Sequence, residues 1–185
     1  MDPSLSHAAA ALRAGGIVAY PTEAVYGLGC DPRNHAAVER LFAIKRRPAT
    51  QGVLLIASEF AQVEPYLDMP SIPQDALDRA GATWPGPHTW IFPRAADAPP
   101  WLAGGHAGLA VRVTAHELAA NLCRAFGGAI VSTSANRHGE PPAMNAEQVR
   151  ATFGAEIDAL LNGPLGGLER PTPIRDAISG ASVRF

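Results

Sequence analysis

The sequence predicts an α/β domain built on one twisted, mixed β-sheet with flanking helices. Short apolar runs rich in β-branched residues alternate along the chain with segments of helical periodicity. Glycine pairs and prolines separate these segments, and a composition of 47% hydrophobic and 17% charged residues is typical of a globular protein. Because 185 residues fit one domain, we expect residues 1–185 to fold as a single unit.

The first half of the chain is expected to alternate helices and strands. Residues 4–14 are predicted to form a helix because a glycine pair ends the segment, and residues 17–20 follow as a buried strand. Asn34 is a helix cap, and apolar side chains at spacings of three and four continue that helix to Ile44. Residues 53–57 form a second buried strand. Two helical stretches complete this half, at residues 59–66 and 73–83.

The second half continues the same pattern. Strands are expected at residues 88–92 and 109–113, on either side of a loop rich in proline and glycine. Thr114 and Glu117 form a capping box for a helix that ends near Phe126. The remaining elements are a strand at 129–132, a helix capped by Asn145 and closed by Gly154, and short extended segments at 157–161, 174–178 and 182–185.

Charge and cysteine content restrict the classes of function. The formal net charge of −2 argues against binding nucleic acid through bulk electrostatics, so a polyanion must meet a local patch. Of 15 cationic side chains Lys45 is the only lysine, which reflects either a coding bias towards arginine or a need for a compact ammonium group. Cys30 and Cys123 lie far apart and form no CxxC, so neither a disulfide framework nor a thiolate metal site is indicated.

The sequence contains no membrane-spanning stretch, no export signal and none of the common catalytic motifs. The apolar stretches are far shorter than the about 20 residues that span a bilayer, and no export signal is visible, so we expect a cytoplasmic protein. No GxxxxGK[ST], GxGxxG, GxSxG or HExxH motif occurs. A Walker-type phosphate loop, a dinucleotide fingerprint, a nucleophile elbow and a zincin site are therefore unsupported.

Five polar segments stand where predicted strands or helices end, the usual place of a ligand site in an open α/β sheet. They are residues 20–29, 45–48, 84–89, 109–113 and 131–136. Each has a structural explanation on its own, such as a tight turn or cations at a helix end. Arg112 lies in an apolar strand, where a buried guanidinium requires a carboxylate or an anionic ligand, and we favour the ligand.

Together and in this order, the segments PTEAVYGLG, KRRP, WPGPHT, LAVRVT and STSAN resemble the YrdC/Sua5 family, in particular its short bacterial threonylcarbamoyl-AMP synthases. The match runs from Ile17 to Asp176 and is far more specific than any one motif. The resemblance implies a single YrdC-like catalytic domain with a ligand groove on the sheet. It also implies a nucleotidyltransferase that converts ATP, L-threonine and bicarbonate into threonylcarbamoyl-AMP and pyrophosphate, for N6-threonylcarbamoyladenosine in tRNA.

The resemblance implies roles for individual residues as well. Lys45 and Arg47 are the catalytic pair that faces the phosphates, and Glu23 is a geometric guess for the acceptor of the threonine proton. Mg²⁺ is the expected cofactor, bound mainly through the ATP phosphates and without a metal site on the protein. The residues that bind threonine or ATP are Thr22, Tyr26, Thr89, Arg112, Ser132, Ser134 and Asn136, with Thr172 and Arg175 closing over the nucleotide.

The chain departs from the family pattern at one place, and two other functions stay open. Gln51-Gly52-Val53 replaces an NPL triplet, and the next strand lacks the histidine of many members, so any histidine contact to threonine is replaced or absent. Proteins that transfer threonylcarbamoyl to tRNA are expected downstream partners. The alternatives are a noncatalytic module that contacts double-stranded RNA or tRNA, and a related enzyme that uses another amino acid.

Overall fold

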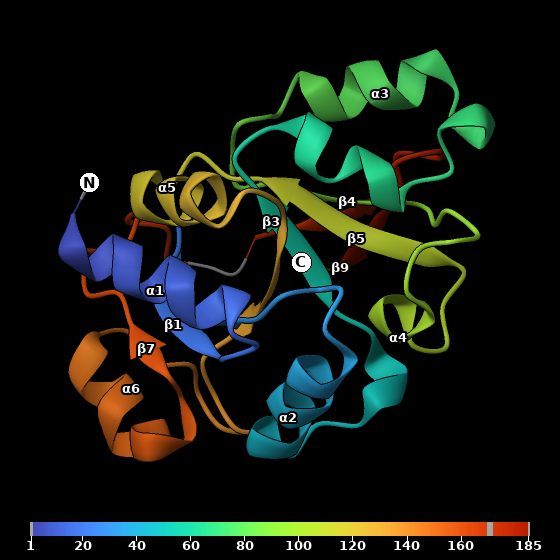
Figure 1. Cartoon of the computed structure of the whole chain (residues 1–185). Coiled ribbons are helices and arrows are strands. Elements are labelled where there is room, and N and C mark those ends of the chain that lie inside the picture. The colour runs from blue at the N-terminus through green and yellow to red at the C-terminus, as the bar shows by residue number, and fades with distance from the viewer. Residues whose placement is uncertain (1, 170–171, 185) are drawn as a thin grey trace.

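A twisted, mixed β-sheet forms the centre of the structure, a computed structural model that describes residues 2–169 and 172–184. Within these residues nine strands are ordered β7-β1-β2-β6-β3-β5-β4-β8-β9 (Figure 1). The strands are β1 (Val18–Pro21), β2 (Tyr26–Gly29), β3 (Leu54–Ala57), β4 (Thr89–Pro93), β5 (Gly108–Val113), β6 (Ile130–Ser134), β7 (Ala159–Leu160), β8 (Ile174–Asp176) and β9 (Ser182–Arg184). The pairs β1–β7, β3–β5 and β4–β8 are parallel and the others antiparallel, which confirms the expected α/β fold.

Helices cover both faces of the sheet. They are α1 (Pro3–Arg13), α2 (His35–Lys45), α3 (Gln74–Gly81), α4 (Pro100–Ala103), α5 (Glu117–Phe126) and α6 (Ala146–Phe153), with shorter 3-10 helices at Ala49–Gln51, Phe60–Gln62, Glu64–Tyr66, Met69–Ser71 and Gly154–Glu156. α1 and α5 lie side by side on one face (Figure 1), where Ile56 joins their apolar cluster. Leu55 belongs to the cluster with α2 and α6, because successive strand residues point to opposite faces.

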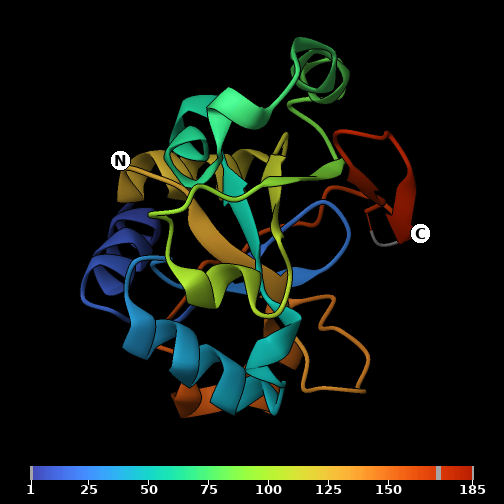
Figure 2. The same cartoon turned by 90° about the vertical axis from the view of Figure 1, so that its right-hand side faces the viewer.

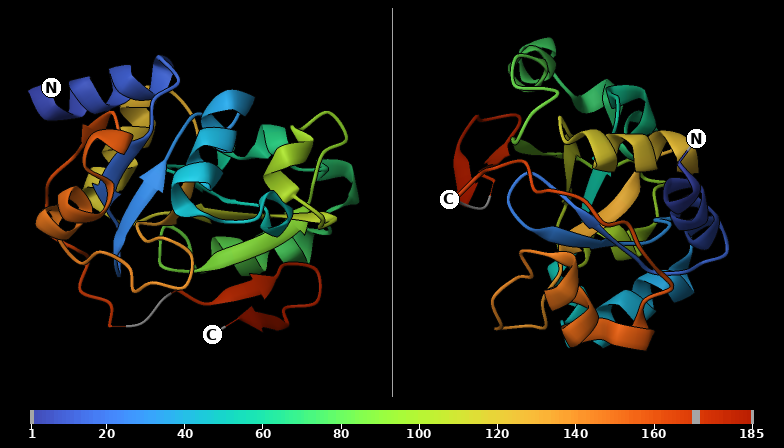
Figure 3. Two further views of the ribbon diagram at one scale, coloured as in Figure 1. Left: turned by 90° about the horizontal axis from the view of Figure 1, so that it is seen from below. Right: turned by 90° about the vertical axis from the view of Figure 1, so that its left-hand side faces the viewer.

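The chain crosses the molecule between β7 and β8, which lie near opposite edges of the sheet (Figure 3). We call residues 161–169 the crossing segment. Its backbone is tied to the turn after β1, because Gly166 N donates to Thr22 O and Leu168 N to Glu23 O, both at 3.0 Å. The β8–β9 hairpin then lies at one edge of the molecule (Figure 2), where β8 pairs with β4.

Local sequence signals placed most helix starts correctly. Asn34 Oδ1 accepts from Ala37 N at 3.1 Å, and Asn145 Oδ1 accepts from Gln148 N at 2.9 Å, as predicted. The predicted capping box at Thr114 is wrong, because the cap of α5 is His116, whose ring nitrogen accepts from Ala119 N. The Thr114 hydroxyl is engaged in a tertiary contact instead, which is described below.

Three other parts of the structure differ from the sequence predictions. One is α4, which lies in the stretch that was expected to be a loop rich in proline and glycine. β2 was not expected, since its four residues include two glycines, but it pairs with β1 and β6. The helical stretch predicted at 59–66 is two short 3-10 helices, Phe60–Gln62 and Glu64–Tyr66, because Pro65 cannot continue a regular helix. Among the described residues no helix has the length and apolar character needed to cross a membrane.

Candidate active site

Arg112 is the centre of a buried polar cluster. Its Nε and Nη2 donate to Thr89 Oγ1 at 3.0 and 2.9 Å, and its Nη2 also donates to Thr172 Oγ1. Nη1 lies 3.1 Å from Glu23 Oε2, and the Arg112 and Glu23 side chains are only 9% and 7% exposed. Thr114 Oγ1 donates to the other carboxylate oxygen of Glu23 at 2.5 Å. The guanidinium group is therefore held on three sides, by β4, by the turn after β1 and by the C-terminal segment.

The partner of Arg112 differs from the sequence prediction. The sequence favours an anionic ligand, but in the structure Glu23 supplies a carboxylate from within the chain. Burial lowers the pKa of Arg112 below its usual value, while the charge of Glu23 opposes the shift. Arginine retains its proton in proteins, so the pair is ionic, and any ligand that approaches it meets a positive group that is already partly compensated.

Lys45 fixes a second polar cluster, at the end of α2. Its Nζ donates to Ser134 O, to Asn136 O at 2.7 Å and to Asn136 Oδ1 at 3.2 Å. Ser134 Oγ donates to the same amide oxygen at 2.6 Å. Burial, followed by the nearby charge of Arg47, lowers the pKa of Lys45 to about 7. Because three oxygen acceptors match the three hydrogens of an ammonium group, this geometry belongs to the protonated side chain.

Arg47 reaches the neighbouring residue of β6. The chain turns at Arg46, which adopts a left-handed conformation with φ of 51° and is exposed. Arg47 Nη1 then donates to Thr133 Oγ1 at 3.1 Å, and its Nη2 donates to Gly52 O at 2.8 Å. Lys45 and Arg47 thus attach α2 and the loop before β3 to the end of β6.

The two clusters are linked through one face of the sheet. Ile56 of β3 is opposite both Arg112 and Ile130, and Leu54 is opposite Ser132, so Arg112, Ser132 and Ser134 point to the same side. With strands about 4.8 Å apart and a rise of about 3.3 Å per residue, Ser132 lies on the order of 12 Å from Arg112. Tyr20 points to the same side, because it is opposite Gly27, which is itself opposite Ser134.

Glycine in β2 keeps this face open next to Thr22. A Cβ atom at Gly27 would lie 3.3 Å from Thr22 Cγ2 and 3.5 Å from Thr133 O, so a larger residue would crowd both polar segments. The Thr22 hydroxyl donates to Val25 O at 2.6 Å within its own turn. The Tyr26 hydroxyl contacts the crossing segment, where it donates to Gly163 O at 2.7 Å and accepts from Gly163 N at 3.1 Å. Both predicted site residues therefore lie beside the Glu23 turn.

Arg175 lies apart from the Arg112 cluster. β8 pairs with β4 so that Thr89 is opposite Ile174 and Trp90 is opposite Arg175. Thr89 and Trp90 point to opposite faces, and the Arg175 guanidinium lies 6.0 Å from the centre of the Trp90 ring. Of the two C-terminal residues grouped by sequence, Thr172 joins the Arg112 cluster and Arg175 does not.

Sequence reasoning missed Thr114 as a site residue. Thr114 follows Arg112 by two positions, and residues two apart on a strand point to the same face. This spacing could have predicted that Thr114 lies beside Arg112. The spacing of Thr114 and Glu117 predicts a helix cap instead, which the structure does not form.

The residues described here are cations, hydroxyls and an amide. Arg112, Ser132 and Ser134 point to one sheet face, whereas Arg47 contacts Thr133, which points to the other. These residues define the class of protein as an α/β domain with a candidate site for an anionic ligand.

Comparison with known proteins agrees with this class. A family model described as "Telomere recombination", which covers the Sua5, YciO and YrdC proteins, matches residues 10–184. The threonylcarbamoyl-AMP synthase of Halorhodospira halophila is 59% identical over 178 residues, 96% of this chain and 92% of the relative. That of Coxiella burnetii RSA 493 is 55% identical over 182 residues, 98% and 97% of the two chains. The chain therefore belongs to the Sua5/YciO/YrdC family.

Solved structures show the same fold. P. abyssi Sua5 in complex with L-threonine superposes with a TM-score of 0.87 at 34% identity, over 93% of this chain and 50% of that chain. This chain thus spans about half the length of the P. abyssi protein. E. coli YciO superposes with a TM-score of 0.81 at 23% identity, over 98% and 90% of the two chains. This second likeness concerns the fold alone.

Proposed function

We propose that the protein condenses ATP, L-threonine and bicarbonate into threonylcarbamoyl-adenylate and pyrophosphate, the activated intermediate for N6-threonylcarbamoyladenosine in tRNA. The observation that carries the proposal is the placement of residues from the family segments on and beside one sheet face. Arg112, Ser132 and Ser134 share that face, and Lys45 and Arg47 attach to the end of β6. The names of relatives that are 55% to 59% identical over nearly the whole chain support the same activity.

The reaction needs positioning and charge neutralisation rather than a protein nucleophile. The threonine amine combines with bicarbonate to give a carbamate and water. A carbamate oxygen then attacks the α-phosphorus of ATP, and the bond to pyrophosphate breaks. Such a transfer depends on holding the attacking oxygen in line with the leaving group while fixed cations and dipoles neutralise moving negative charge. Protein groups of these kinds are the ones found on the candidate face.

The contacts suggest distinct tasks for the charged residues. Arg112 and Arg47 carry permanent positive charge towards the substrates. The Lys45 ammonium group donates three hydrogen bonds, to Ser134 O and to two oxygens of Asn136. We therefore propose that Lys45 positions the turn after β6 and does not bind a phosphate directly. Both oxygens of Glu23 are bonded, to Arg112 and Thr114, so Glu23 orients Arg112 and is a poor candidate for the proton acceptor of threonine.

Mg²⁺ would supply the additional neutralisation of the phosphates when ATP binds. The donor set of the chain fits a metal held through the substrate. In residues 2–169 and 172–184 no group of three or more His, Cys, Asp or Glu side chains is arranged to hold a metal ion. Ser132, Ser134 and Asn136 offer neutral oxygens that can orient substrate groups without competing for the cation.

Pyrophosphate release tests the proposal directly. The purified protein is incubated with Mg-ATP and bicarbonate together with threonine, serine or no amino acid. We expect release that requires both threonine and bicarbonate. Release supported equally by serine would assign the domain to another amino acid. No release under any condition, together with tight binding of double-stranded RNA, would overturn the enzyme and favour a binding module.

A further inference from the structure

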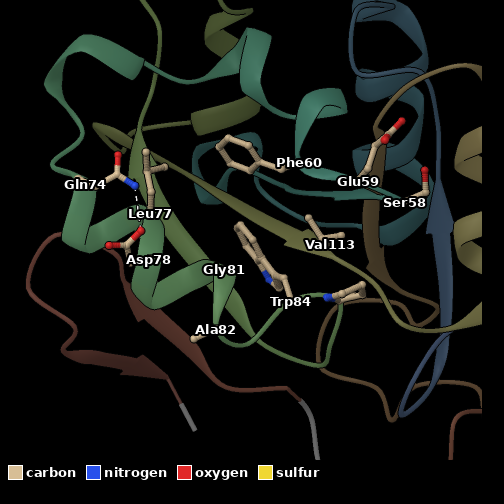
Figure 4. Close-up of a pocket in the computed structure, with 11 residues that line it drawn as sticks. Ser58, Glu59, Phe60, Gln74, Leu77, Asp78, Gly81, Ala82, Trp84 and Val113 are labelled. Atoms are coloured by element: carbon tan, nitrogen blue, oxygen red, sulfur yellow. Dashed lines mark hydrogen bonds between the residues drawn. The ribbon is translucent and has the colours of Figure 1, made fainter.

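A cavity of about 730 Å³ lies outside the candidate active site, between α3, the end of β3 and the turn at Trp84 (Figure 4). Its lining includes none of the residues assigned above to threonine, ATP or phosphate. The volume lies within the range of about 300 to 1,000 Å³ that is typical of small-molecule sites. The proposed synthesis reaction leaves this cavity unexplained.

The middle of the cavity is apolar and aromatic. Phe60 and Trp84 form one wall, with ring centres 6.0 Å apart and planes tilted by 31°. Leu77 and Val113 add aliphatic surface (Figure 4). The Trp84 ring is fixed because its Nε1 donates to His88 O at 2.8 Å. A rigid aromatic wall of this kind suits an aliphatic chain and attracts positive charge.

The charged groups of the lining are all negative. Glu59 and Asp78 stand at opposite sides of the cavity, with the aromatic wall between them (Figure 4). No lysine, arginine or histidine lines the cavity, and within the described residues neither carboxylate forms an ion pair. The Asp78 carboxylate accepts a hydrogen bond from the neutral amide of Gln74, at 2.8 Å. The cavity therefore disfavours nucleotides and favours a ligand with positive charge at two separated points.

A buried hydroxyl beside Glu59 also lacks a partner. Ser58 lines the cavity, is 8% exposed, and in the described part of the chain its Oγ forms no hydrogen bond. A buried polar atom without a partner is costly, so it is a place where a ligand hydrogen-bond donor or acceptor is expected. An ammonium group next to Glu59 would supply such a donor.

We propose that this cavity binds a linear aliphatic diamine or polyamine. The methylene chain lies along Phe60 and Trp84, and the terminal ammonium groups approach Glu59 and Asp78. Ser58 accepts a hydrogen bond from the nitrogen at the Glu59 end. A ligand with one charged end would leave the other carboxylate uncompensated, whereas two charged ends match both. The site binds its ligand independently of ATP and threonine.

Isothermal titration calorimetry of the full chain with spermidine and cadaverine, at low ionic strength and without ATP, tests the proposal. We expect saturable one-to-one binding. Pentylamine, which carries one nitrogen, should bind about threefold to fivefold more weakly than cadaverine, the value of one exposed ion pair. Glu59→Gln and Asp78→Asn should each weaken cadaverine binding by a similar factor.

Glu64→Gln is the matched control, because Glu64 is an exposed carboxylate of the same region that does not line the cavity. It makes the same change in net charge and should leave binding unchanged. Thermal unfolding checks that each variant is folded. Equal losses in Glu64→Gln and Asp78→Asn would show diffuse charge attraction and overturn the site. The same conclusion would follow if cadaverine did not bind, if pentylamine bound as tightly as cadaverine, or if a Lys-Leu-Lys peptide bound more tightly than spermidine.

Discussion

Glu23→Gln isolates the charge that compensates Arg112. A glutamine has nearly the same shape, and its side-chain oxygen can still accept from Thr114 Oγ1, which lies 2.5 Å from the present carboxylate. The contacts of Arg112 to the hydroxyls of Thr89 and Thr172 also remain. What is lost is the negative charge beside a guanidinium group whose side chain is 9% exposed.

The expected cost is about 3 kcal/mol of unfolding free energy, because removal of one partner leaves the other charge buried and uncompensated. For a domain of this size, each kcal/mol lowers the melting temperature by about 2 to 4 °C, so a decrease of about 6 to 12 °C is expected. Arg112→Met should be similarly destabilising, because it leaves the Glu23 carboxylate buried. The double variant removes both charges, and most of the loss should be recovered.

Urea unfolding of the wild type, the two single variants and the double variant completes the cycle. Glu64→Gln, an exposed carboxylate, controls for net charge. Because Glu23→Gln leaves the positive charge of Arg112 free to attract anions, added ATP should stabilise this variant more than it stabilises the wild type. The reasoning is refuted if Glu23→Gln unfolds within about 0.5 kcal/mol of the wild type and the double variant is simply additive.

Three further predictions concern the same site. Arg47→Ala should stay folded but lose about 2 to 4 kcal/mol of transition-state stabilisation, measured as the rate of pyrophosphate release. Arg46→Asn, at an exposed position, should retain most activity, and equal losses in the two variants would contradict the role assigned to Arg47. Since the pKa of Lys45 is about 7, its ammonium loses a proton as pH rises through 7, and synthesis should fall; Lys45→Arg, which does not titrate, should lack this limb of the pH profile. A Cβ at Gly166 would lie 2.9 Å from Glu23 Cα, so Gly166→Ala should displace the crossing segment. Hydrogen exchange should become faster at the amides of residue 166 and Leu168, which donate to Thr22 O and Glu23 O, whereas Gly128→Ala, whose Cβ meets nothing closer than 4.0 Å, should not have this effect.

Helices and strands could be predicted from the sequence where the residues that determine them lie within the same element. Asn34 and Asn145 cap helices because the geometry of a helix start needs nothing from the rest of the chain. Thr114 carries the same kind of signal, but a buried carboxylate competes for its hydroxyl and the cap moves to His116. β2 gave no signal, because its pairing with β1 and β6 supplies what its glycines lack in strand propensity.

The candidate site was predictable as a set of residues but not as a set of contacts. Sequence reasoning anticipated that a buried Arg112 needs an anion, yet Glu23 is 89 residues away, and only the folded sheet brings the two together. Arg175 shows the opposite case. It is close in sequence to Thr172, but strand pairing with β4 sets it next to Trp90, away from Thr89. Distance along the chain therefore predicts neither the pairing of Glu23 with Arg112 nor the separation of Arg175 from Thr172.

Thr172 is the member of the Arg112 cluster that is synthesised last. It follows every other member of the Arg112 cluster along the chain, and it contacts a side chain that β5 has already placed under the turn after β1. During synthesis on the ribosome, Glu23, Thr89 and Arg112 emerge and can pair well before this last hydroxyl arrives. A nascent chain can therefore form the contacts among Glu23, Thr89 and Arg112 while the bond to Thr172 is still missing.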